Sequence, residues 1–238
     1  MAAVLLALAA SASWGVSDFL GGLKTRAVPV LTVLAVSQPA GLILLGTIVL
    51  ARLQPPPDGL PILWAVLAGF GGAIGIGALY QGLAVGSMGI VAPITATSPL
   101  IPLTVGLLRG ERPSALQLTG IAVALQSAAS DDPYWATFIL RIASSTLVLV
   151  AVTRHPPSPG PAGIWLVLIL IGFLDSGATE LFAVATTKGL LSVVAVLAAL
   201  YPVLVAVLAR VVLHERLTVV QRSGALAAVA GAAAISAG

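Results

Sequence analysis

The sequence predicts an all-α polytopic membrane protein, and three observations support this. Hydrophobic residues make up 59% of the 238 residues and charged residues only 8%, whereas an ordinary soluble domain is ~25% charged. The mean hydropathy is +1.11. The apolar stretches approach the ~20 residues that cross a ~30 Å hydrocarbon core, and none alternates with the period of a membrane strand. Helices are therefore the elements expected to satisfy the backbone in lipid.

Glycine, proline and charged residues divide the chain into nine apolar stretches, which predict nine transmembrane helices. The stretches are 2–22, 30–51, 60–83, 88–108, 115–130, 133–152, 162–187, 190–212 and 219–236. The first begins without the basic region of a signal peptide and continues past Trp14, so we expect a membrane helix there.

Composition also excludes several classes of function. The net charge of +3 comes from Lys and Arg residues between the stretches, which indicates membrane topology rather than nucleic-acid binding. The chain has no cysteine, and its two histidines lack companion acidic clusters, so we expect no disulfide, metal or cofactor. The glycine-rich run 69–77 lies inside an apolar stretch with no preceding strand, which favours helix packing over nucleotide binding. We therefore expect no enzyme and no ATP-driven pump.

A short polar motif occurs twice and reveals a duplication. Glu, a hydroxyl residue, Gln and Gly recur at a constant offset of 104: Glu111, Ser114, Gln117 and Gly120, then Glu215, Thr218, Gln221 and Gly224. The hydroxyl and Gln fit a capping box, and each Glu suits the positive end of the helix that follows it. The motif is best interpreted as a helix start.

The duplication predicts two repeats, 1–130 and 131–238. An offset of 103 aligns Asp132 with Pro29, so the second repeat has no counterpart of residues 1–28. Two arrangements follow: nine spans as the chain is written, or a ten-helix architecture of two inverted five-helix repeats with one helix missing after Ser130. The charge bias between the two faces is clearer with nine spans, whereas the repeat alignment favours ten.

The chain resembles the EamA-type family of the drug/metabolite transporter superfamily. The resemblance is carried by Trp14-Gly15 in the first stretch, Ala92-Pro93 followed by Ser98-Pro99, Leu108-Arg109-Gly110-Glu111 and Leu213-His214-Glu215. It implies ten helices in two inverted repeats around a central cavity, which move small metabolites by alternating access. The chain departs from this pattern because the first helix of its second repeat is missing.

Four ionisable residues inside predicted spans are the main site candidates, because a charge at mid-bilayer costs at least ~2.5–3.5 kcal/mol. They are Asp18, Arg141, Asp175 and Glu180. Asp175 and Glu180 differ by five positions, so they point ~140° apart on a helix and are not expected to share one face. A carboxylate would bind a cationic group or a coupling proton, with Arg141 as counter-ion. The alternative is a buried structural ion pair, or charges that reach the interface.

Aromatic and amide side chains are the second set of substrate-binding candidates. They are Trp14, Gln38, Tyr80, Gln81 and Tyr201. Trp64, Trp165, Tyr134 and Trp135 are instead expected to anchor span ends at the interface. Pro93, Pro99 and Pro202 are expected to break helices, as occurs near the central sites of transporters.

The sequence thus predicts a multi-pass protein of the cell membrane that transports a small metabolite, amino acid or drug-like solute by alternating access. Its partners would be the lipid bilayer and the solute, with a proton as a candidate coupling ion and a homodimer as a candidate assembly. The alternative is a membrane subunit that does not transport and acts only through helix packing with partners.

Overall fold

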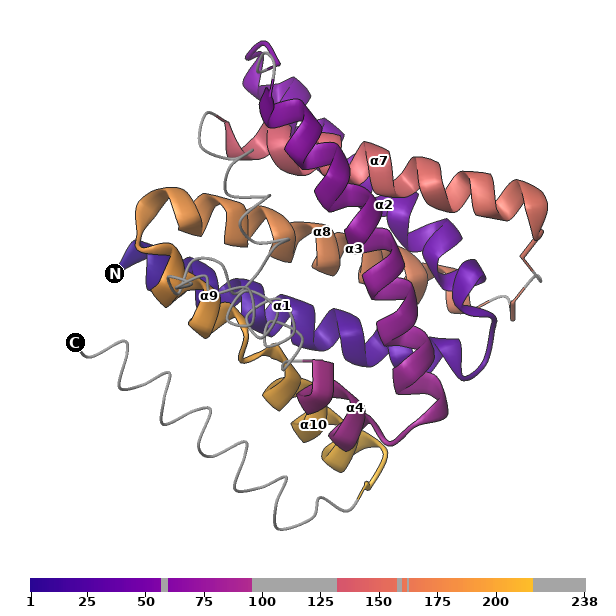
Figure 1. Cartoon of the computed structure of the whole chain (residues 1–238). Coiled ribbons are helices and arrows are strands. Elements are labelled where there is room, and N and C mark those ends of the chain that lie inside the picture. The colour runs from indigo at the N-terminus through magenta and orange to yellow at the C-terminus, as the bar shows by residue number, and fades with distance from the viewer. Residues whose placement is uncertain (57–59, 96–131, 158–159, 162, 216–238) are drawn as a thin grey trace, which may run out of the picture.

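The described part of the chain is helical, and six of its segments are long and apolar enough to cross a membrane. The structure is a computed structural model that describes residues 1–56, 60–95, 132–157, 160–161 and 163–215 (Figure 1). The helices are α1 (Ala2–Thr25), α2 (Val30–Arg52), α3 (Leu60–Val85), α4 (Met88–Thr95), α7 (Pro133–Arg154), α8 (Ile164–Lys188), α9 (Leu191–Ala198) and α10 (Tyr201–Val212). The all-α membrane class is confirmed. The predicted total of nine or ten helices depends on residues outside these ranges.

The sixth candidate span, Val193–Val212, combines α9 and α10. The helix is interrupted at Ala199 and Leu200, and Pro202 occupies the first turn of α10. Proline is tolerated there because the first amides of a helix have no partner within the helix. The structure therefore places Pro202 just after a break inside a span. Pro93 lies within α4, and Pro99 lies outside the described residues.

Helices α1 and α8 lie side by side at the centre of the bundle, and α2 also packs on α8 (Figure 1). Small residues allow the backbones to approach closely. A Cβ atom added to Gly172 of α8 would collide with the backbone oxygen of Ser37 in α2, and one added to Gly41 would collide with the Ser176 hydroxyl. In lipid such close packing replaces the hydrophobic driving force between helices.

The N-terminus of α7 is fixed by Asp132. Its carboxylate accepts hydrogen bonds from the amides of Tyr134 and Trp135 at 2.9 and 3.3 Å, and Pro133 follows as the first helical residue. An acidic N-cap and a proline at N1 are both favourable helix starts. The same carboxylate pairs with Arg52 at the end of α2, with Nη1 2.7 Å from Oδ1 and 3.0 Å from Oδ2.

This contact sets the direction of α7 relative to the first repeat. The nine-span arrangement predicts that 133–152 begins at the bundle end opposite to Arg52, whereas the ten-helix arrangement predicts that it begins beside Arg52. The structure places Asp132 beside Arg52. Helix α7 thus begins at the end of the bundle where α2 ends. The number of helices between α4 and α7 lies outside the described residues.

Candidate functional site

A cluster of buried polar groups lies where α1, α2, α7 and α8 meet. Arg141 of α7 is its centre: Nη1 donates to Gln38 Oε1 at 2.7 Å, and Nη2 lies 2.8 Å from Asp175 Oδ2. Gln38 Oε1 also accepts a hydrogen bond from Ser144 Oγ at 2.9 Å. The guanidinium is therefore held by two helices of different predicted repeats, α2 and α8. Its Nε has no hydrogen-bond partner among the described residues.

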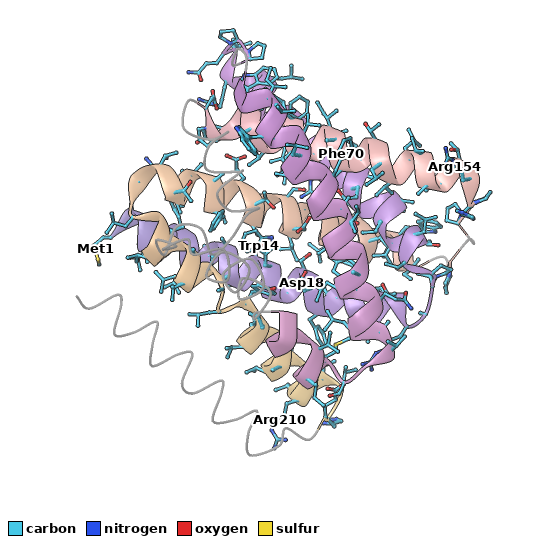
Figure 2. All side chains as sticks on the ribbon, viewed as in Figure 1. Met1, Trp14, Asp18, Phe70, Arg154 and Arg210 are labelled. Carbon is cyan, nitrogen blue, oxygen red and sulfur yellow. The ribbon has the colours of Figure 1, made fainter. Side chains whose placement is uncertain are left out.

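A second carboxylate near this cluster is Asp18, which lies on α1 one turn after Trp14 (Figure 2). The residue is 3% exposed, and its Oδ1 has no hydrogen-bond partner within the described chain. It lies within electrostatic range of Asp175. The cluster contains two carboxylates and one guanidinium, and Arg141 pairs with Asp175. Asp18 consequently forms no ion pair with any described cation.

Tyr80 connects α3 to α1 close to Asp18, through Ser17 and Gly21. It is 1% exposed, its hydroxyl lies 3.4 Å from Ser17 Oγ, and its ring packs where a Cβ atom on Gly21 would stand. Ser17 Oγ also donates to the backbone oxygen of Ile171 at 3.2 Å. Tyr80 therefore approaches α1 through the space that a glycine leaves.

Aromatic residues lie one turn along α1 from Asp18, on the side of α9 and α10. The ring of Trp14 is 5.6 Å from that of Phe182 and 6.4 Å from that of Tyr201, between centroids. Such separations are typical of favourable aromatic pairs. Trp14 thus joins α1 to Phe182 of α8 and to Tyr201 at the start of α10.

Asp175 and Glu180 both contact α7 despite the five positions between them. Asp175 meets Arg141, and Glu180 accepts a hydrogen bond from Thr137 Oγ1, one turn earlier on α7. Asp175 contacts α7 although it points away from Glu180, because the long Arg141 side chain extends to it. Glu180 Oε1 has no hydrogen-bond partner among the described residues.

The remaining predicted site residue, Gln81, is exposed. Its neighbour Tyr80 is buried, because successive helix residues differ by ~100° in direction. Trp64 and Trp165, expected as interface anchors, are 40% and 39% exposed. The ring of Tyr134 instead stacks under Arg52, with 3.8 Å between the guanidinium carbon and the ring centroid.

Sequence reasoning missed five residues that take part in these contacts: Ser17, Arg52, Asp132, Thr137 and Ser144. Hydroxyl residues and charges at span ends are common, so their types alone gave no signal. Ser144 follows Arg141 by three positions and Thr137 precedes it by four, and these helical spacings could have identified both.

The repeated motif supplies one further contact, at the opposite end of the bundle. Glu215 accepts hydrogen bonds from Ser87 Oγ at 2.8 Å, Gly89 N at 3.2 Å and Met88 N at 3.4 Å, and Arg26 Nη2 lies 3.4 Å from its Oε1. Burial raises the pKa of Glu215, but these hydrogen bonds outweigh it and lower that pKa below its usual value. The residue was expected to suit the start of the helix after it, which lies outside the described residues. Among the described residues it binds the N-terminus of α4. The rest of the motif, and its first copy, lie outside the described residues.

A family model described as the EamA-like transporter family matches residues 1–130 and again residues 125–237. The chain belongs to the EamA-like transporter family. The two matches cover both predicted repeats, and this family is one of membrane transporters rather than enzymes. No curated protein matches the sequence. The buried polar cluster is the candidate transport site of this EamA-like protein.

Proposed function

We propose that the protein is a secondary transporter of the cell membrane that moves a small organic solute bearing a cationic amine. The observation that supports this most is Asp18, a buried carboxylate that pairs with no cation among the described residues, whereas Arg141 already pairs with Asp175. An unpaired carboxylate in a span is costly, and a bound ammonium group would offset that cost. Trp14, Phe182 and Tyr201 would contact the apolar part of the solute.

The mechanism we propose is alternating access between two polar contacts at opposite ends of the bundle. Arg26–Glu215 and Arg52–Asp132 each join one predicted repeat to the other. Opening one contact while the other holds would expose the central cluster to one side of the membrane at a time. Such rocking of repeats about a midplane site is typical of secondary transporters built from inverted repeats.

Proteoliposomes test the proposal with a panel of small primary amines, each paired with its uncharged hydroxyl analogue. We expect uptake of at least one amine, and we expect Asp18→Asn to reduce it more than tenfold because the ammonium loses its counter-charge. Gln81→Leu is the control, since Gln81 is exposed and outside the cluster. Amine uptake unchanged by Asp18→Asn would refute the assignment of the site. Absence of flux across the panel, with a stable complex to another membrane protein, would favour the subunit that does not transport.

A further inference from the structure

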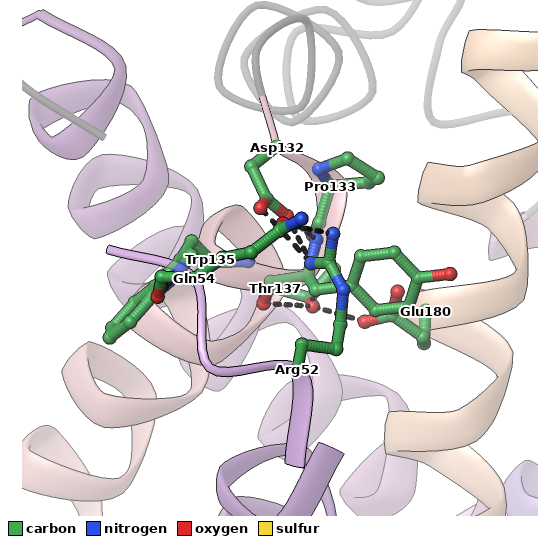
Figure 3. Close-up of polar contacts among 8 residues, drawn as sticks. Arg52, Gln54, Asp132, Pro133, Trp135, Thr137 and Glu180 are labelled. Atoms are coloured by element: carbon green, nitrogen blue, oxygen red, sulfur yellow. Dashed lines mark hydrogen bonds and ion pairs between the residues drawn. The ribbon is translucent and has the colours of Figure 1, made fainter. Parts of the chain in front are cut away.

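A second buried carboxylate, Glu180, lies beside Thr137 and close to the Arg52–Asp132 pair (Figure 3). It is 7% exposed, on the α8 turn that follows Asp175. Its Oε2 contacts Thr137 Oγ1, and its Oε1 has no partner among the described residues. An ionised carboxylate accepts hydrogen bonds with both oxygens, so a charged Glu180 would leave a buried acceptor unsatisfied.

Thr137 can act as either the donor or the acceptor in its hydrogen bond with Glu180. Thr137 Oγ1 lies 3.1 Å from the backbone oxygens of both Pro133 and Tyr134, in addition to Glu180. A hydroxyl has one hydrogen to donate and can also accept. If Glu180 is protonated, it donates to Thr137, which donates in turn to a backbone carbonyl. If Glu180 is ionised, Thr137 turns its only hydrogen towards it. The same residues thus accommodate both states.

The charged groups around Glu180 come from two helix ends. Arg52 at the end of α2 and Asp132 at the start of α7 act on it electrostatically, with opposite signs. Helix α1 contributes Asp18, which lies close to Asp175, and α9 (Leu191–Ala198) carries no titratable side chain. On α8 itself, Lys188 is exposed at the C-terminal end.

Arg52 is engaged with Asp132 rather than with Glu180. Both oxygens of Asp132 lie within 3.0 Å of Arg52 Nη1, so the guanidinium charge is largely offset. Separation of α2 from α7 would break this pair and leave Arg52 able to stabilise an ionised Glu180. By thermodynamic linkage, loss of the proton would in turn favour that separation.

We propose that Glu180, with Thr137 as its hydrogen-bond partner, is a proton-binding site whose occupancy is linked to the Arg52–Asp132 contact. The ligand is a proton because Thr137 contacts one carboxylate oxygen directly and the other, Oε1, is fully buried, which leaves no space for a metal cation. The inference concerns a site other than the central cluster and stands whether or not that cluster binds an amine.

Infrared difference spectroscopy of the purified full chain, titrated from neutral to acidic pH, tests this without a transported solute. We expect a protonated-carboxyl C=O band that Glu180→Gln removes. Thr137→Val should shift the band to higher frequency, because one hydrogen bond is lost, and Thr137→Ser should restore it. Gln81→Leu is the control and should leave the band unchanged, since Gln81 is exposed and takes part in neither end contact.

The linkage is tested by Asp132→Asn, which should move the midpoint of the band to lower pH by about one unit, because Arg52 is then free to stabilise the ionised form. The titration should be the same in sodium chloride and choline chloride. Identical spectra for the wild type and Glu180→Gln would overturn the proposal. A band insensitive to both Thr137 variants, or a midpoint that sodium shifts, would also overturn it. The Thr137 variants provide the test if Glu180→Gln does not fold.

Discussion

At the residue scale, Arg141 is the side chain on which the central cluster depends. It is 3% exposed and bonds Gln38 and Asp175 on two other helices. A buried charge of this kind is tolerated because its partners replace water. The cost of removing one partner is therefore much greater than the cost of removing both.

A double-mutant cycle measures this difference. Arg141→Met should reduce the free energy of unfolding by about 3–5 kcal/mol, because it leaves Asp175, whose side chain is only 14% exposed, without its cation. The double variant Arg141→Met/Asp175→Leu should recover most of that loss. Unfolding in detergent, followed by tryptophan fluorescence, gives the values. Additive losses in the double variant would show that the two charges do not depend on each other.

The sequence predicted the ionisable members of the cluster because few side chains are so costly inside a span. Asp18, Arg141, Asp175 and Glu180 could be selected on that ground alone. To choose between Tyr80 and Gln81, one must know which face of α3 is buried. A helix that is apolar on all sides has no amphipathic pattern to show this. Burying Thr137 or Ser144 in lipid costs little free energy, because a hydroxyl can hydrogen-bond the backbone of its own helix as readily as a group on a neighbouring helix. Their roles emerged only when α7 was placed against α2 and α8.

At the element scale, the contact between α2 and α8 depends on the absence of two side chains. If a Cβ atom were added to Gly172 or Gly41, it would lie closer to atoms of the facing helix than van der Waals contact allows. Gly177, on the same helix as Gly172, has nothing within 4 Å of such an atom. Both glycines therefore have helical backbone in α8, but only Gly172 is in close contact with a neighbouring helix.

Alanine substitutions separate these two situations. Gly172→Ala should destabilise the protein by about 1–3 kcal/mol, because α2 must move away from α8. Gly177→Ala should be neutral or stabilising by up to about 1 kcal/mol, since alanine is the better helix former. Thermal unfolding of the two variants side by side supplies the comparison. Equal effects would show that helix propensity, and not the α2–α8 contact, determines the outcome at Gly172.

Helix ends were predicted more accurately than their contacts. The polar segment at 213–215 was expected to end one span and start the next, and α10 does end at Val212. Glu215 was expected to suit the helix that follows it, which lies outside the described residues, and it also bonds the start of α4, far away in the sequence. The local sequence indicates that an acidic residue suits a helix N-terminus, but tertiary packing decides which helix N-terminus it contacts.

At the scale of the whole molecule, the two end contacts define which loops share a face. Arg52 and Asp132 lie at one end of the bundle, and Arg26, Ser87 and Glu215 lie at the other. The sequence left this arrangement open because charge bias and repeat alignment disagreed. The pairing of Asp132 with Arg52 fixes the end of the bundle at which α7 begins, and the number of helices between α4 and α7 lies outside the described residues.

Single cysteines on this cysteine-free chain test the sidedness. In membrane vesicles, Gln54→Cys and Lys188→Cys should react with an impermeant maleimide from one side, and Ser87→Cys and His155→Cys from the other. Each residue lies at a helix end and is exposed. Labelling of Gln54→Cys and His155→Cys from the same side would contradict the orientation of α7.

The close approach at Gly41 has a mechanical consequence. Gly41 lies at the midpoint of α2 (Val30–Arg52), about 16 Å along the axis from either end. Backbone in contact with backbone leaves little compressible material, so this crossing is suited to act as a fulcrum. A small rotation about it produces the greatest displacement at the tips of α2, and Arg52 is at one of those tips. The lever would thus concentrate motion on the Arg52–Asp132 ion pair while the centre of the bundle remains nearly still.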